Sequence, residues 1–327
     1  MTLGDLLRRP VVVAPMAGGP SVPGLVVAAA RAGALGFLAA GYKTPDAMLA
    51  EIAAVRAGTD EPFGVNVFVP GEPCTAAGEL ARYVAAIGAD PGGATWDDDH
   101  YDGKVRVLLA DPPPVVSFTF GCPPPEVIAA FRAAGTVVVI TVTSPREAVT
   151  AADAGAAALG VQGSEAGAHR GTFANVDAPE YRLLDLIGAV AAASALPLIA
   201  AGGIMSAAQV QAVLAAGAVA AQCGTAFLRC PESGAHPLHK AALADPRYTT
   251  TTLTRAFSGR PARALVNRFI LDHAGAPAAY PEINNATRPL RAASAARGDT
   301  EGMSLYAGQG FRSALTLPAA EIVARLS

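Results

Sequence analysis

The strongest constraint on the fold is a regular alternation of short, continuously apolar segments with longer, alanine-rich segments. The apolar segments are rich in valine, isoleucine and alanine, are bounded by turn residues, and show no polar–apolar alternation. Such segments are typical of parallel strands that are covered on both faces. Eight of them follow one another along the chain: residues 11–14, 35–38, 63–69, 114–120, 136–142, 158–162, 197–201 and 218–223.

The intervening segments have helical patterns with recognisable beginnings and ends. Thr44 and Ser144 stand where N-caps are expected, each directly before a proline. Several segments close with Ala-Gly, and the glycine suits the left-handed conformation that often follows a helix. Eight parallel strands joined by helices predict an α/β fold, a (β/α)8 TIM barrel, with catalytic residues at the carboxyl ends of the strands.

The alternation stops after the eighth strand. We expect the barrel in residues 1–228, with 258–271 as a candidate segment for rejoining it. Residues 229–257 and 272–327 have patterns of short polar helices and turns, and we expect them to form a smaller, mainly helical lid domain. Two intervals between strands are longer than the others: 70–113 carries a Gly/Pro-rich segment, and 163–196 carries a long loop, 164–179. Long loops at the active face often carry specificity.

Composition excludes several classes of protein. The formal net charge is −3 and the basic residues are not clustered, so we expect no nucleic-acid partner. A hydrophobic content of 52% with only 16% charged residues is incompatible with disorder. The uncharged stretch 186–228 is mostly Ala and Gly and is broken by Pro197, so we expect no membrane span.

Cysteine usage and the first residues point to a cytoplasmic protein. The four cysteines stand far apart without metal-ligand spacing, so we expect buried thiols and no metal site. Residues 1–10 lack the apolar core of a signal peptide. The chain also lacks the motifs of zinc proteases, α/β-hydrolases, P-loop NTPases and Rossmann dinucleotide-binding proteins.

Two glycine-rich segments follow the last two strands, where barrel enzymes often bind phosphate. One is Gly202 and Gly203; the other consists of Gln222, Cys223, Gly224 and Thr225. Small residues let main-chain N–H groups approach an anion, and the amino terminus of a following helix favours negative charge. Each motif alone is also an ordinary turn, but their joint position predicts a phosphate site.

The loop after the sixth strand, QGSEAGAHRG (162–171), holds the candidate catalytic residue His169. A histidine at the active face can act as a general base near neutral pH. The alternative is a loop histidine bonded to the main chain. The three glycines and Arg170 favour a loop shaped around a flat ligand that carries negative charge.

Further candidates lie in the first and third strands. Ala14, Pro15 and Met16 form a rigid exit from the first strand, where a methionine side chain can lie against a planar ring. The alternative is a tight turn with a core methionine. Asn66 is a polar amide in an apolar strand and needs a specific partner, either a ligand or a group in the barrel core.

The substrate pocket has three candidate residues. Ser117 lies near the end of the fourth strand, where its side chain is a candidate for facing inward. Tyr306 and Gln309 lie in YAGQG near the carboxyl terminus, which either closes a pocket or packs the terminal segment onto the barrel.

Taken together, these segments resemble the nitronate monooxygenase family, formerly called 2-nitropropane dioxygenases, which are FMN-dependent barrels with a small helical lid. The segments AAGGI and GTAF would also fit other FMN barrels, whereas SFTFG, AHRG and YAGQG favour the nitronate group. One departure is Gly167-Ala168, where the family often has Gly-Gly before the histidine. The matching segments span nearly the whole chain in order: APMAGGPS (14–21), GVNVF (64–68), VVSFTFG (115–121), QGSEAGAHRG (162–171), AAGGI (200–204), QCGTAFL (222–228), INNATRPLR (283–291) and YAGQG (306–310).

The resemblance implies FMN as the cofactor and assigns residues to it. His169 matches the family's active-site histidine, and Tyr101 and Tyr306 are candidates for the aromatic residues on the substrate side. The flavin ring and ribityl chain would contact the main chain of Ala14, Pro15 and Met16, and also Asn66 and Gln162. The rest of the chain and the phosphate would be surrounded by Gly167, Gly202, Gly203, Gln222, Cys223, Gly224 and Thr225.

The function that the resemblance implies is FMN-dependent oxidation of alkyl nitronates, with nitroalkanes as a further substrate class. The partners would be the small nitronate and O2, the products carbonyl compounds and nitrite, and a homodimer is left open. The nearest alternative is an NAD(P)H oxidoreductase like the FMN-dependent enoyl-acyl-carrier-protein reductases. A flavin-binding protein without turnover is a second alternative. An aldolase-type barrel is disfavoured because it needs a Schiff-base lysine and the chain has only Lys43, Lys104 and Lys240.

Overall fold

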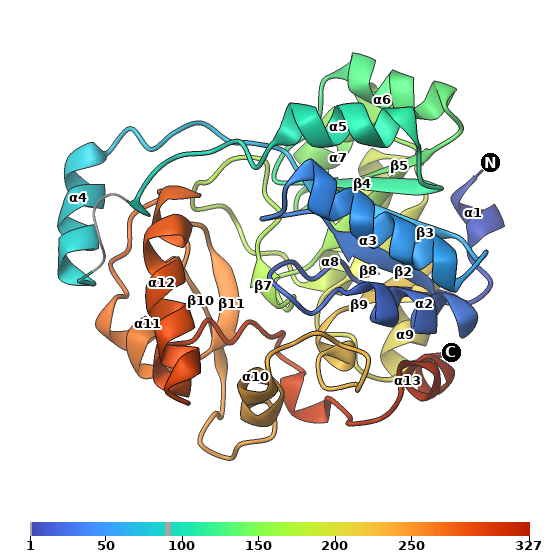
Figure 1. The fold of residues 1–327 in the computed structure, drawn as a ribbon. Helices are drawn as coiled ribbons and strands as arrows, with labels where there is room; N and C mark the ends of the chain where they lie inside the picture. The colour runs from blue at the N-terminus through green and yellow to red at the C-terminus, as the bar shows by residue number, and fades with distance from the viewer. Residues whose placement is uncertain (1, 89–92) are drawn as a thin grey trace.

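The structure, a computed structural model, describes residues 2–88 and 93–327 and confirms the predicted barrel (Figure 1). Eight parallel strands close in the order β1-β2-β3-β4-β5-β6-β8-β9, and β9 pairs with β1 through Gln222 opposite Val12. The strands are β1 (Val11–Val13), β2 (Leu35–Ala39), β3 (Phe63–Phe68), β4 (Val115–Thr119), β5 (Val137–Val142), β6 (Ala158–Gln162), β8 (Leu198–Ala201) and β9 (Ala220–Cys223).

Eight helices surround the barrel (Figure 1). The last of them is the terminal helix, which the sequence places in the lid. Its residues Ile322 and Val323 are instead buried in the same core as the neighbouring barrel helices. The terminal helix therefore belongs to the barrel layer and not to a lid. In chain order the helices are α2 (Pro23–Arg31), α3 (Pro45–Gly58), α5 (Tyr101–Ala110), α6 (Pro125–Ala133), α7 (Pro145–Asp153), α8 (Leu183–Ala193), α9 (Ala207–Ala215) and α13 (Ala319–Leu326).

Side chains fill the barrel interior and close its amino-terminal end. Phe37 of β2 is 1% exposed and lies so close to Gly64 of β3 that a Cβ there would be 2.2 Å from its ring. The short helix α1 (Leu3–Leu6) buries Leu3 and Leu6 against residues near the strand starts. The site must therefore form at the opposite end, where the strands lead into the loops.

A second part of the molecule stands beside the barrel mouth. It contains a three-stranded antiparallel sheet of β10 (Thr251–Thr254), β11 (Ala262–Leu265) and β7 (Ala168–His169). Sequence analysis expects only helices and turns here, with 258–271 as a candidate for rejoining the barrel. That segment instead supplies β11, which pairs with the loop that carries His169.

Helices complete this second part: α10 (Pro237–Ala242), α11 (Arg268–Asp272) and α12 (Glu282–Ala296). The insertion after β3 contributes α4 (Ala77–Ala86), which lies beside α12 and away from the barrel (Figure 1). Tyr83 of α4 and Ile283 of α12 share a small apolar cluster. None of the helices that the structure describes has the length and apolar character needed to cross a bilayer.

Candidate functional site

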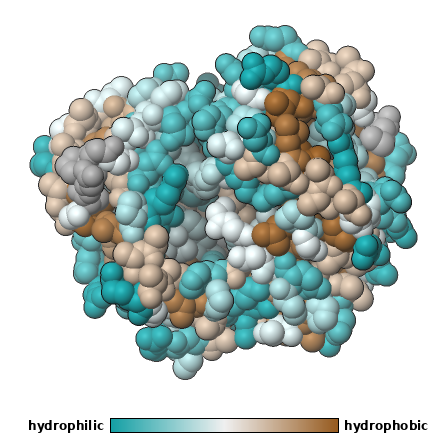
Figure 2. Space-filling view, viewed as in Figure 1, coloured by the Kyte–Doolittle hydropathy of each residue, from teal (hydrophilic) through white to brown (hydrophobic). Residues whose placement is uncertain are grey.

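A cavity of about 500 Å³ lies at the carboxyl ends of the barrel strands, within the usual range for cofactor sites. Its walls come from the barrel loops and from α12, and the face drawn in Figure 2 is hollowed between these parts. Most of the residues singled out from the sequence line it: Ala14, Pro15, Met16, Asn66, Gln162, Gly167, His169, Gly202, Gly203, Gln222, Cys223, Gly224, Thr225 and Tyr306.

Two of the three substrate-pocket candidates, Ser117 and Gln309, do not line the cavity, and neither does the further aromatic candidate Tyr101. Ser117 lies beneath Asn66, whose amide nitrogen is 2.9 Å from its hydroxyl and 3.0 Å from that of Thr119. Gln309 is exposed, and only its main-chain N–H is engaged, donating to a carbonyl of the loop after β6. Tyr101 packs against Phe118 behind the strands. Whether each of these side chains faces the cavity depends on its direction and exposure in the fold, which the spacing of residues along the chain does not determine.

One end of the cavity, which we call the glycine end, consists of Gly202, Gly203, Gly224 and Thr225. The backbone φ is 140° at Gly202 and 67° at Gly203, a region that favours glycine. The N–H groups of Gly203, Gly224 and Thr225 make no hydrogen bond to any described residue. Free N–H groups beside small residues form a cradle that fits the phosphate of a bound cofactor.

The opposite end, which we call the aromatic end, surrounds His169 with Phe120, Tyr280 and Tyr306. Their ring centres lie 5.7, 5.5 and 5.3 Å from that of the imidazole. The guanidinium of Arg260 lies 4.2 Å from the centre of the Phe120 ring. These side chains come from distant parts of the chain and pack around the histidine, forming an aromatic chamber.

Burial in this chamber lowers the pKa of His169 to about 3, with the cations Arg260 and Arg291 adding to the effect. The imidazole is therefore neutral at physiological pH. Its Nε2 lies 2.8 Å from the hydroxyl of Ser258, which is also 3.1 Å from the carbonyl of Arg260. Nδ1 makes no hydrogen bond to a described residue and is free for a substrate.

Gln162 fixes the loop that carries the histidine. Its amide nitrogen donates to the carbonyl of His169 at 3.0 Å, and its amide oxygen accepts from the N–H of Gly171 at 2.7 Å. The residue just before His169, Ala168, has a φ of 61°, which is unfavourable for a side chain with a Cβ. Gln162 therefore both lines the cavity and positions the histidine.

Tyr42 is a cavity residue that sequence analysis does not identify. Its φ is 66°, and its hydroxyl lies 3.0 Å from that of Tyr280. Asp99 accepts a hydrogen bond from the Tyr42 N–H at 2.8 Å and lies 2.7 Å from Nζ of the fully buried Lys104. Burial raises the pKa of Asp99 and lowers that of Lys104. The one signal in the sequence is that Lys104 shares the helical spacing of the apolar residues Tyr101, Val105 and Leu108.

The α12 side of the cavity is cationic. Arg288 and Arg291 line it together with Asn284 and Ser304. Arg291 donates to the carbonyl and the side-chain oxygen of Asn284 at 2.8 and 2.9 Å, so its guanidinium is held in place. The cavity therefore attracts small anions.

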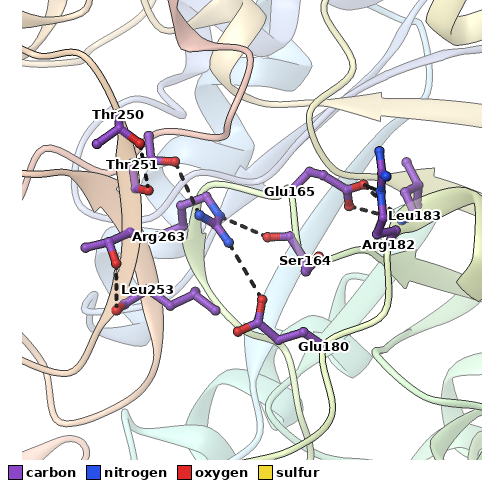
Figure 3. Close-up of polar contacts among 10 residues, drawn as sticks. Ser164, Glu165, Glu180, Arg182, Leu183, Thr250, Thr251, Leu253 and Arg263 are labelled. Atoms are coloured by element: carbon purple, nitrogen blue, oxygen red, sulfur yellow. Dashed lines mark hydrogen bonds and ion pairs between the residues drawn. The ribbon is translucent and has the colours of Figure 1, made fainter.

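Polar contacts attach the loop after β6 to the small sheet (Figure 3). Arg263 of β11 donates from Nε to the carbonyl of Ser164 at 2.9 Å and from Nη1 to the Thr251 hydroxyl at 3.3 Å. Glu165 accepts from the N–H of Leu183 at 3.0 Å, which ties the same loop to the start of α8. These contacts connect His169 to both parts of the molecule.

Comparisons with known proteins cover the whole chain. The family described as "Nitronate monooxygenase" matches residues 2–327. A nitronate monooxygenase of Pseudomonas aeruginosa is 39% identical over 98% of this chain and 95% of its own length. The solved structure of a nitroalkane oxidase from Streptomyces ansochromogenes is 51% identical with a TM-score of 0.95, covering 99% of this chain and 96% of that one. FabK from Thermotoga maritima is 28% identical with a TM-score of 0.78, covering 99% and 94%.

Proposed function

The chain belongs to the nitronate monooxygenase family, and on that premise we propose that it uses FMN and O2 to oxidise alkyl nitronates to carbonyl compounds and nitrite. One observation carries the proposal: a single cavity joins a cradle of free N–H groups to a neutral histidine in an aromatic chamber. The first feature suits a cofactor phosphate, and the second suits a small organic substrate.

The residues present fit FMN. Its phosphate would be held by the N–H groups of Gly203, Gly224 and Thr225, and Met16 and Asn66 would contact its ring. A Cβ on Gly203 would lie 3.0 Å from that of Glu165, which is a tight contact, so glycine suits this point. Bound FMN supplies the electron transfer from the nitronate to O2. FMN is favoured over FAD because no Rossmann fingerprint accompanies the cradle.

The chain's own residues bind and orient the substrate. Arg288 and Arg291 attract an anionic nitronate, and the aromatic end excludes water from around it. With a proton on Nδ1, His169 donates a hydrogen bond to the nitro oxygens while Nε2 accepts from Ser258. A nitronate is already a carbanion equivalent, so its oxidation needs no strong base.

A neutral nitroalkane makes a different demand on the same histidine, since a C–H proton must first be removed. If Ser258 donates to the Arg260 carbonyl, the Nε2 of His169 carries the proton and Nδ1 offers a lone pair. The hydroxyl of Ser258 thus serves either tautomer. We include nitroalkanes as substrates because the Streptomyces structure at 51% identity is described as a nitroalkane oxidase.

The alternative of an NAD(P)H-dependent enoyl reductase has less support. FabK, the structural neighbour that bears on it, is 28% identical, compared with 39% and 51% for the nitronate and nitroalkane relatives. Anaerobic mixing with NADH separates the two functions. Rapid bleaching of the flavin by NADH would favour the reductase, and a stable oxidised spectrum favours the nitronate enzyme.

The proposed function is tested first by the colour of the purified protein. We expect a flavin spectrum, release of about one FMN per chain on denaturation, and nitrite formation from propionate 3-nitronate in air. A colourless protein that takes up no FMN on reconstitution would overturn the proposal. Retained FMN without nitrite from any nitronate would indicate a flavin-binding protein without turnover.

We also propose a cytoplasmic location. Cys74, Cys122, Cys223 and Cys230 are all free thiols, and two of them are buried. Unpaired cysteines are usual in reducing compartments, where disulfides are rare. Alkylation of the protein in intact cells, followed by mass spectrometry, should find all four thiols reduced.

A further inference from the structure

A second cavity, of about 210 Å³, lies on the other side of the strand that carries His169. Successive side chains of a strand point to opposite faces, so His169 faces the main cavity while the next residue, Arg170, faces the second. The two cavities have no lining residue in common. The second is lined by Arg170, Thr172, Val176, Asp177, Ala178, Glu180, Leu253, Thr254, Arg255, Pro261, Ala274 and Ala276.

Arg170 is buried without a partner. It is 5% exposed, yet none of its five N–H donors makes a hydrogen bond to a described residue, and Nη1 is fully buried. Two neighbouring arginines are similarly buried and each makes hydrogen bonds: Arg260 donates to carbonyls of Arg170 and Thr172, and Arg263 donates to Ser164 and Thr251. A buried guanidinium without a partner is costly, so Arg170 is the exception that needs an explanation.

The acidic residues around the second cavity contact other arginines and not Arg170. Asp177 lies 2.7 Å from Nη1 of Arg255, at the exposed rim. Glu180 lies 3.9 Å from Nη2 of Arg263, a contact drawn in Figure 3, and its side chain is 54% exposed. Burial lowers the pKa of Arg170, and the more distant carboxylates of Glu180, Glu147 and Glu165 oppose that shift. One positive charge therefore remains without a contacting counter-charge.

We propose that the second cavity is a binding site for one small monovalent oxyanion, with Arg170 as its principal ligand. A guanidinium presents paired N–H donors that match two oxygens on one atom, as in a carboxylate or nitrite. Thr172 and Thr254 line the same space. A dianion such as sulfate would exceed the single free charge and would meet Asp177 and Glu180 at the rim.

The oxyanion has two possible sources. Nitrite is a product of the proposed reaction, so a preference for nitrite rests on the proposed function. A metabolic carboxylate would bind without reference to that function. Acetate and nitrite are therefore used as separate probes, and binding is measured without turnover, so that failure of the site and failure of the proposed function are distinguishable.

The experiment is thermal unfolding of the holoprotein in millimolar sodium acetate or nitrite, against chloride at equal ionic strength. A ligand at roughly ten times its Kd should raise the Tm by about 2 °C. Arg170→Met removes the buried charge and keeps an unbranched side chain, so it should abolish this response. Arg268→Met is the matched control, because that side chain is 67% exposed and lines neither cavity.

Two readouts separate this site from anion binding in the main cavity. Anions at Arg170 should leave the flavin absorbance unchanged, whereas anions beside the flavin perturb it. The Tm response should also survive Arg291→Met, which alters only the main cavity. An equal response in wild type and Arg170→Met would overturn the proposal, as would the absence of any response in the wild type. A sulfate response matching that of acetate would overturn the preference for a monovalent anion.

Discussion

The two ends of the main cavity use the same uncommon backbone conformation in opposite ways. At the glycine end the residues with positive φ are Gly202 and Gly203, where no side chain opposes it. At the aromatic end they are Tyr42, Phe120 and Ala168, with φ of 66°, 78° and 61°. All three carry a Cβ, so the conformation is strained.

The difference reflects what each end contributes. The glycine end acts through main-chain N–H groups and needs close approach, so a side chain would only obstruct it. The aromatic end acts through side chains, and there the positive φ orients a ring or precedes His169. The strained conformation of Tyr42 is stabilised by the hydrogen bond that its N–H donates to Asp99. Asp99 itself lies beside the buried Lys104. The structure thus tolerates strain where it needs a side chain and avoids it where it does not.

The largest effect is expected from a charge at the glycine end. In Gly203→Asp a carboxylate would enter the space that we assign to the phosphate. Two like charges about 4 Å apart repel by ~4 kcal/mol at an effective dielectric of ~20, so FMN affinity should fall at least roughly 10³-fold. Fluorescence titration of the apoprotein with FMN measures this, and circular dichroism should show an intact barrel.

Gly217→Asp is the matched control for backbone strain. Gly217 also has a positive φ, 107°, and a Cβ there would have nothing within 4 Å. This variant should bind FMN like the wild type. If Gly203→Asp also retains wild-type affinity, the phosphate lies elsewhere and the contrast between the two ends fails.

A smaller and substrate-dependent effect is expected at the aromatic end. A positioned base contributes about 10²–10⁴-fold to proton abstraction, whereas a hydrogen bond to a charged group is worth roughly 10–150-fold at most. His169→Asn should therefore nearly abolish nitroalkane oxidation and weaken the oxidation of preformed nitronates only modestly. Steady-state kcat/KM with each substrate measures the difference, and FMN content should not change.

His239→Asn provides the comparison within the same cavity. His239 is also neutral, because burial lowers its pKa to about 4, and its Nε2 lies 3.0 Å from the carbonyl of Tyr306. Its loss should affect both substrates equally. Equal losses in His169→Asn would refute the role as base and leave His169 as an orienting residue. Since the pKa of His169 is about 3, neither activity should show a titration of this group above about pH 5.

The sequence predicts the two ends of the cavity unequally. The glycine end follows directly from the ends of two barrel strands, so a local motif and its position in the barrel suffice to predict it. The aromatic end brings together Tyr42, Phe120, Tyr280 and Tyr306, whose proximity depends on how the second part of the molecule packs. No spacing along the chain encodes that arrangement.

The same reason explains the errors outside the cavity. The strand β10, with the sequence TTLT, is half-buried throughout, so it lacks both an apolar run and an alternating pattern. Its sheet also depends on β7, which is only two residues long. The terminal helix α13 has apolar residues at helical spacing, but their partner, the barrel surface, follows from topology.

The smallest expected effect is on stability, and it comes from a substitution that removes backbone strain without removing a contact. It tests the difference between the two ends of the cavity most directly. Ala168→Gly places at the aromatic end the residue that the glycine end uses. A left-handed alanine costs about 1–2 kcal/mol, whereas an added glycine costs about 0.5–1 kcal/mol through unfolded-state entropy. The variant should therefore be more stable by about 0.5–1 kcal/mol, which calorimetry would detect as a rise in Tm of roughly 0.7–1.5 °C. Ala216→Gly, where φ is −78°, should lose stability instead, since there is no strain to relieve. If Ala168→Gly is destabilised like this control, the positive φ before His169 is not strained, and the two ends of the cavity do not differ in the way that their backbone angles indicate.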